Sequence, residues 1–149
     1  MTDIHDLTVT ELAAAIGRKE LSPVQITAHY LDRTDRLNSG LGAFFTVTAE
    51  LATSQAAEAE QAVTQAQDPA ELPPLTGIPI PIKDLNMVAG VRQTLGSAVY
   101  ADNVPDTGGD VTGRINAHPV DVMPGVMGEL GGRTPAEPCR YPPGTGARR

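Results

Sequence analysis

The decapeptide Leu-Thr-Gly-Ile-Pro-Ile-Pro-Ile-Lys-Asp at residues 75–84 is the most informative stretch of this 149-residue sequence. Its three isoleucines alternate with two prolines, so one face of an extended segment is apolar. The prolines lie on the other face and have no N–H to donate to a neighbouring strand. The pattern predicts an edge strand or an irregular extended segment rather than a central strand.

Lys83 ends this segment and is followed by Asp84. Strict alternation directs its side chain away from the isoleucine face. Two interpretations stay open on the residues alone. Lys83 is either a charge at the solvent end of a strand, paired with Asp84, or a partly desolvated lysine whose neutral amine is a usable base. The other lysine, Lys19, lies between Arg18 and Glu20, and we expect it to be a solvated surface charge.

Two helix starts precede the decapeptide. Thr8-Val9-Thr10-Glu11 has the form of a capping box, and Gly17 is placed to end the short helix that follows. Ser22-Pro23-Val24-Gln25 is a second capping signal, with proline at the first helical position. We expect the second helix to end near residues 38–40 and to present an apolar stripe of Ile26, Tyr30 and Leu37, with Leu31 beside it.

Further elements are predicted on both sides of the decapeptide. Residues 43–48 are β-branched and aromatic and indicate a short strand, and residues 50–67 form an Ala-rich run with high helix propensity. Its apolar side is mostly alanine, with Leu51 and Val63. A helix begins at Asp110, although Gly113 weakens it.

Composition excludes several classes of function. The formal net charge of −7 repels phosphate backbones, so we expect no direct nucleic-acid ligand. Cys139 is the only cysteine, which excludes an internal disulfide and is compatible with a reducing cytoplasm. The sequence has neither a signal-peptide pattern nor the run of about 18 apolar residues that a membrane span requires, so we expect a cytoplasmic protein that does not enter a membrane.

No cofactor or metal is expected. The three histidines, His5, His29 and His118, are separated by distances that fit no metal motif, and the one cysteine has no partner ligands nearby. Gly108-Gly109 is not followed by the residues of a phosphate-binding loop.

Residues 75–84 resemble the lysine motif of the amidase-signature family, Leu-x-Gly-Ile/Val-Pro-x-x-Ile/Val-Lys-Asp. In the segment at residues 41–44, which also resembles the family, Gly42 departs from the asparagine that is usual there. The resemblance covers about residues 7–115, because five further segments agree in order and spacing: 20–24, 30–33, 41–44, 94–97 and 103–111.

The resemblance implies an α/β fold, in which this chain supplies the N-terminal helices and the first strands of the mixed sheet of an α/β/α sandwich. It also implies hydrolysis of a carboxamide through a Ser–cis-Ser–Lys triad and an acyl-enzyme, and Lys83 matches the catalytic lysine. The family's two serines lie in a Gly/Ser-rich stretch that this sequence does not contain. Ser97 belongs to a Thr-x-Gly-Ser turn and is not expected to be the nucleophile.

We therefore expect a chain that is inactive alone, with a small-molecule amide as the substrate of the full-length family. The Ala-rich helix and the isoleucine face are expected to need partners outside the chain, which predicts marginal stability. A glutamine-hydrolysing subunit of a tRNA-dependent amidotransferase is an alternative, although residues 84–86 and 100–103 favour stand-alone amidases. A non-catalytic truncated or interaction protein is the alternative from another class. No partner chain is identified by the sequence.

The character of the sequence changes after residue 117. Residues 118–149 contain six prolines and six glycines, and their apolar residues follow neither the strand nor the helix period. This composition predicts a disordered tail after an N-terminal amidase portion at residues 1–117. A shifted reading frame would explain the abrupt loss of resemblance, and a short, diverged product is the rival explanation.

Overall fold

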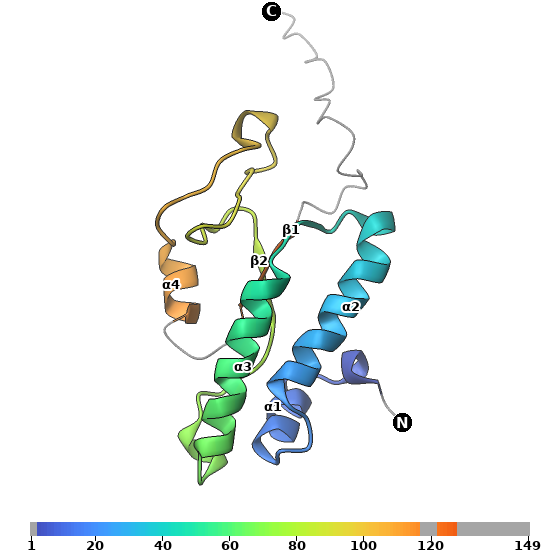
Figure 1. Cartoon of the computed structure of the whole chain (residues 1–149), viewed down its shortest axis with the longest axis vertical. Helices are drawn as coiled ribbons and strands as arrows, with labels where there is room; N and C mark the ends of the chain where they lie inside the picture. Colours follow the sequence, from blue (N-terminus) through green and yellow to red (C-terminus); the bar gives the residue numbers. More distant parts are fainter. Residues whose placement is uncertain (1–2, 117–121, 128–149) are drawn as a thin grey trace, which may run out of the picture.

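The computed structural model describes residues 3–116 and 122–127. Two long helices, α2 and α3, lie side by side across one face, and α3 also packs against the strands behind it (Figure 1). The elements in chain order are η1 (Ile4–Asp6), α1 (Val9–Gly17), α2 (Pro23–Leu41), β1 (Phe44–Val47), α3 (Ala49–Gln65), η2 (Pro69–Glu71), β2 (Ile80–Lys83), η3 (Ala98–Tyr100), α4 (Asp110–Asn116) and β3 (Val122–Met127). Helices laid over a small sheet make the chain α/β, as predicted.

The sheet is mixed, with strand order β1-β3-β2. β1 runs antiparallel to β3, with Phe44 opposite Met127. β2 runs parallel to β3, with Ile80 opposite Val122 and Lys83 opposite Met127. β2 is therefore an edge strand among the described residues, which confirms the position predicted from its prolines.

β3 lies within the segment for which the sequence predicts a disordered tail, and here the structure differs from that expectation. Strand pairing uses backbone N–H and C=O groups, so residues without periodic side chains can still fill the space between two strands. The rest of the predicted tail, residues 118–121 and 128–149, lies outside the described residues.

Both capping boxes are formed. The Thr8 hydroxyl accepts from the Glu11 N–H, and the Glu11 carboxylate accepts from the Thr8 N–H. Ser22 and Gln25 exchange the equivalent two bonds, and Pro23 occupies the first turn. α1 ends at Gly17 as predicted. α2 continues slightly past the predicted end, to a left-handed cap at Gly42 (φ 60°).

The buried apolar side chains form two clusters. The first contains Leu12, Ile16, Ile26, Val63 and Ile78, and it joins α1, α2, α3 and the segment before β2. The second contains Ile82, Val88 and Val91, with Ile80 packed against it. The isoleucine row of residues 78–82 thus contributes to both clusters. The chain itself buries Ile78 and Ile82, so the expectation that this face needs an outside partner is wrong for these two residues.

α3 buries a stripe of small residues at helical spacing, namely Ala52, Ala56, Ala59 and Val63. This stripe faces the rest of the chain and lets α3 approach α2 closely, so the Ala-rich helix also finds its partners within the chain. The prediction that Leu51 belongs to the apolar side is wrong. Leu51 is 38% exposed because it lies one position, about 100° around the helix, from the buried stripe.

The apolar stripe predicted for α2 is buried only in its first half. Ile26 is fully buried and Tyr30 packs against the first cluster, whereas Leu37 is 40% exposed. The first cluster lies at the N-terminal half of α2, so the C-terminal half extends beyond the described side chains that could cover it.

Candidate functional site

Lys83 is the last residue of β2, and its side chain is exposed. Along β2 the buried Ile82 lies between the exposed Pro81 and Lys83, which confirms that Lys83 leaves the isoleucine face. Lys83 is exposed, and none of the ion pairs among the described residues involves its amine. The amine is therefore available to groups that this part of the chain does not supply.

Asp84 has the opposite environment, because it is only 5% exposed. Its carboxylate accepts three hydrogen bonds: from the Thr94 N–H at 2.8 Å, the Thr94 hydroxyl at 2.6 Å and the Gly96 N–H at 3.1 Å. Asp84 thus binds the 94–97 turn rather than Lys83, and the interpretation of the two as an ion pair is wrong. A buried carboxylate needs such donors to offset its desolvation.

The 94–97 turn is tight. Its two central residues, Leu95 and Gly96, have positive φ angles of 52° and 68°, and the Ser97 N–H donates to the Thr94 carbonyl at 2.9 Å. Leucine adopts this conformation at a cost, which the bonds to Asp84 help to offset. The Ser97 hydroxyl accepts from the Val99 N–H and caps η3.

A second set of hydrogen bonds joins the two arms of the loop after β2. Gln93, which is 5% exposed, donates from its side chain to the Asp84 carbonyl at 3.0 Å. Its backbone N–H donates to the Asn103 carbonyl at 2.9 Å, and the Asn103 amide donates back to the Gln93 carbonyl at 3.2 Å. Sequence reasoning missed Gln93 as a positioning residue, because a single glutamine in a loop carries no periodic signal.

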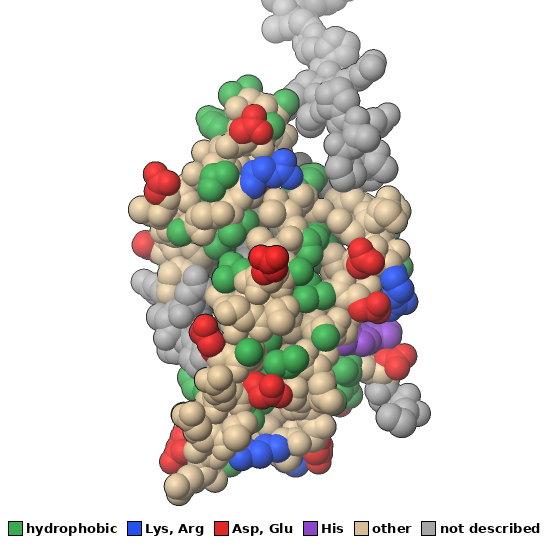
Figure 2. All heavy atoms as spheres, viewed as in Figure 1, with side chains coloured by type: hydrophobic (Ala, Val, Ile, Leu, Met, Phe, Trp, Pro, Cys, Tyr) green, Lys and Arg blue, Asp and Glu red, His purple; other side chains and the backbone are tan. Residues whose placement is uncertain are grey.

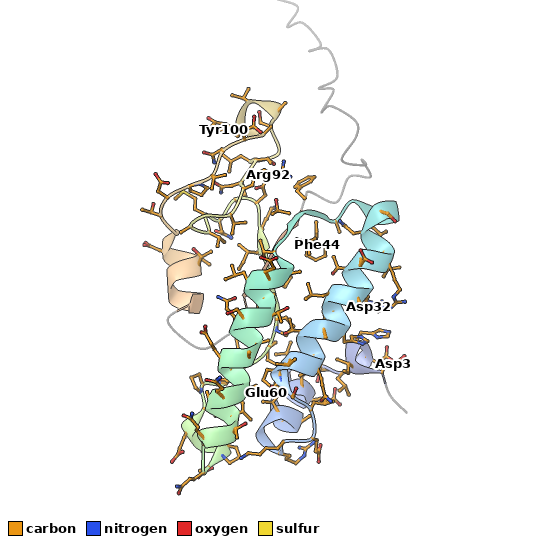
Figure 3. All side chains as sticks on the ribbon, in the orientation of Figure 1. Asp3, Asp32, Phe44, Glu60, Arg92 and Tyr100 are labelled. Carbon is orange, nitrogen blue, oxygen red and sulfur yellow. The ribbon has the colours of Figure 1, made fainter. Side chains whose placement is uncertain are left out.

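Hydrogen bonds also attach the loop to α4 and β1. The Met87 carbonyl accepts from the Gly109 N–H at 2.9 Å and from the hydroxyl of Thr112, a buried residue of α4. Arg92 donates to the Phe45 carbonyl at 3.0 Å, so the loop contacts β1 near the labelled Phe44 (Figure 3). The segment that follows Lys83 is thereby fixed to β1 and α4.

Large apolar side chains are exposed along this same loop. Val99 is 85% exposed and Leu85 is 64% exposed. Figure 2 shows green apolar side chains at the top of the visible face, where this loop lies in Figure 1, and others over the two long helices. The others in the loop and at the start of α4 are Met87, Leu95, Tyr100, Val104 and Val111. The loop after Lys83 therefore leaves several large apolar side chains exposed to water.

The histidines depart from the sequence prediction. His5 Nδ1 lies 3.1 Å from His29 Nε2, although 24 residues separate the two in the chain. The expectation that the histidines form no constellation is therefore wrong for this pair, because the packing of η1 against α2 brings them together. His118 lies outside the described residues.

Comparison with known proteins agrees with the layered α/β fold. The family model described as Amidase matches residues 25–120. This chain therefore belongs to the amidase family, the amidase-signature enzymes.

No helix in the described part of the chain has the length and apolar character needed to cross a bilayer.

Two curated relatives and one solved structure illustrate the similarity. The chain is 35% identical over 113 residues to a glutamyl-tRNA(Gln) amidotransferase subunit from Geobacter sp. (strain M21), covering 76% of this chain and 22% of the relative. Identity to the protein of the same name from Methylococcus capsulatus is 39% over 114 residues, covering 76% and 23%. The native peptide amidase of Stenotrophomonas maltophilia superposes with a TM-score of 0.71 at 25% identity, covering 82% of this chain and 24% of that one.

The chain spans less than a quarter of the length of these relatives. It resembles the N-terminal part of amidase-signature enzymes, which agrees with the fold class predicted from the sequence.

Proposed function

We propose that Lys83 is the catalytic base of an amidase-type site whose serines are not supplied by this chain, and that the chain alone hydrolyses no amide. In this site the neutral lysine takes a proton from a bridging serine, which takes one from the nucleophilic serine as it attacks the carboxamide carbon. The bridging serine returns a proton to the nitrogen as the C–N bond breaks, so ammonia or an amine leaves. Water then hydrolyses the acyl-enzyme to a carboxylate and restores the nucleophilic serine.

One observation carries the proposal. Lys83 is exposed at the end of β2, while the next residue, Asp84, is buried and held by three hydrogen bonds to the 94–97 turn. The backbone that carries the lysine is therefore fixed, but its amine is free to meet other groups. A general base needs this combination of a rigid support and an accessible nitrogen.

The exposed apolar side chains of the loop after Lys83 support the statement that the chain alone hydrolyses no amide. Chain segments packed over Leu85, two residues after Lys83, and over Leu95 in the turn that binds Asp84 would also remove water from around the lysine amine. Desolvation disfavours the charged form of a lysine and makes the amine a better base. In the chain alone the Lys83 side chain is exposed, so the proposed site needs these segments as well as the nucleophilic serine.

A chimera tests the proposal. Residues 7–115 replace the corresponding part of a full-length amidase of the family, and ammonia release is measured with a panel of simple amides. We expect no release from the chain alone, and release from the chimera that falls about 10²–10⁴-fold or more in Lys83→Ala. Lys19→Ala, which changes the other lysine of the chain, is the matched control and should retain activity.

Two results would contradict the proposal. Full activity of the chimera with Lys83→Ala would remove the lysine from the mechanism. Amide hydrolysis by the chain alone that disappears in Lys83→Ala would show that the chain contains its own nucleophile.

A second candidate is the glutamine-hydrolysing role of an amidotransferase. It is favoured by the names of the curated relatives, whose identity of 35–39% exceeds the 25% shared with the peptide amidase. Glutamine in the amide panel distinguishes the two. Preferential release of ammonia from glutamine by the chimera supports the amidotransferase role only if the donor amidase itself does not prefer glutamine.

A further inference from the structure

Four side chains of the kinds that ligate metals meet where η1 packs against α2. The carboxylates of Asp3 and Asp6 and one ring nitrogen of His5 all lie within 4.8 Å of one another. His29 of α2 joins them through its contact with His5. Figure 2 shows the histidine side chains at the surface among acidic ones, and Asp3 lies on the same side of the molecule as Asp32 (Figure 3).

The two imidazole rings meet edge to edge. Their planes differ by 13° and their centroids lie 5.2 Å apart, whereas the facing nitrogens, His5 Nδ1 and His29 Nε2, lie only 3.1 Å apart. One of these nitrogens must therefore carry the proton and the other must accept it. The other nitrogen of His5, Nε2, lies 3.9 Å from the Asp6 carboxylate.

We propose that Asp3, His5 and Asp6 form a binding site for a divalent transition-metal ion such as Zn²⁺. His5 ligates through Nε2, and its Nδ1–H donates to His29. Imidazole and carboxylate are both zinc ligands, and three protein ligands leave a fourth position for water. Ligand atoms on one zinc ion stand about 3.3 Å apart, so small rotations of the exposed aspartates close the site from the separations observed.

His29 is a positioning residue in this site. A metal-bound histidine commonly donates its second N–H to a neighbouring acceptor, which fixes the tautomer and the ring orientation. His29 is half-buried and lies edge-on to Tyr30, which packs against the first apolar cluster. The acceptor is thus held by the core, while His5 is half-buried and the two aspartates are exposed, so a metal can enter from solvent.

The chain's net charge of −7 favours the approach of a cation. Binding would also connect the N-terminal segment to α2, because the ligands lie in and before η1 and the positioning residue lies in α2. The imidazole ligand favours zinc-type ions over Mg²⁺, which prefers oxygen ligands.

Calorimetric titration of the tag-free chain with Zn²⁺, and separately with Mg²⁺, tests the site. We expect saturable one-site binding of Zn²⁺ alone. His5→Ala and the Asp3→Asn/Asp6→Asn double variant should each weaken binding at least tenfold, whereas Asp35→Asn, an exposed acid on α2, should not change it. The aspartates are exposed, so the double variant keeps the fold even if His5→Ala does not.

Substitutions of His29 distinguish a role in positioning His5 from a role in folding alone. His29→Phe removes the acceptor and should weaken Zn²⁺ binding about 10–100-fold. His29→Asn restores an acceptor and should recover most of the affinity, and nitrogen NMR should show the metal on Nε2 of His5. Absence of saturable Zn²⁺ binding, or binding that survives both His5→Ala and the aspartate double variant, would overturn the proposal.

Discussion

The Asp84 carboxylate accepts hydrogen bonds from both the backbone N–H and the hydroxyl of Thr94, at 2.8 and 2.6 Å. This pairing joins the residue after Lys83 to a turn ten residues later in the chain. It explains why the aspartate follows the lysine in the motif: Asp84 fixes the backbone at the point where Lys83 leaves the sheet.

Asp84→Asn should destabilise the chain by about 1–3 kcal/mol, because it replaces one accepting oxygen with an NH₂ group that faces the N–H and O–H donors of the turn. Chemical denaturation followed by circular dichroism measures the change. Asp106→Asn is the matched control, because Asp106 is an exposed acid in the same loop. This variant should lose little unfolding free energy. Equal losses in the two variants would contradict a specific role for the Asp84 bonds.

Gly77→Ala should be strongly destabilising for two reasons. Gly77 has φ +75°, and a Cβ there would lie 2.5 Å from Pro23 Cγ, which is buried in the first turn of α2. Gly90→Ala isolates the backbone contribution, because Gly90 has a similar φ of +73° and open space around its Cβ position. We expect Gly90→Ala to lower the free energy of unfolding by about 1 kcal/mol. Gly77→Ala should lower it by about 1–3 kcal/mol more. Similar unfolding free energies for the two variants would show that Pro23 moves aside without cost.

Ala56→Leu should destabilise the packing of α3 by about 1–3 kcal/mol, because Ala56 is fully buried in the close approach of this helix. Ala57→Leu places the same side chain on the exposed face and should change stability by less than about 0.5 kcal/mol. Thermal unfolding of the pair checks this. If Ala56→Leu stabilises the chain, the Ala-rich stripe leaves space that the structure does not show.

Glu11 provides a pH-dependent test. Its pKa is lowered, first by the hydrogen bond from the Thr8 backbone N–H and then by that from the Thr8 hydroxyl. A group with a lowered folded-state pKa contributes stability that is present above its unfolded pKa and is lost as the pH falls through the folded value. The stability difference between wild type and Glu11→Gln should therefore shrink on acidification below the ordinary range of a glutamate. Carboxyl-carbon NMR of Glu11 measures the lowered pKa directly, and an unchanged difference at all pH values would contradict the capping box.

Local features were predictable from the sequence. Both capping boxes, the proline at the start of α2 and the end of α1 depend on residues within one helical turn of each other. The lysine motif is also local, since alternation along residues 78–83 places Ile82 inward and Lys83 outward without reference to any other element. The family resemblance rested on such short segments and was confirmed.

Long-range contacts were decided by the tertiary structure alone. Four features depend on which surfaces pack together. They are the bond from Thr94 to Asp84, the contact of His5 with His29, the pairing of β3 between β1 and β2, and the exposure of Leu51 and Leu37. A sequence specifies the direction of a side chain within its own element, because backbone geometry repeats at a fixed period. What that side chain then meets depends on the arrangement of elements that lie far apart in the chain, and no local period records it.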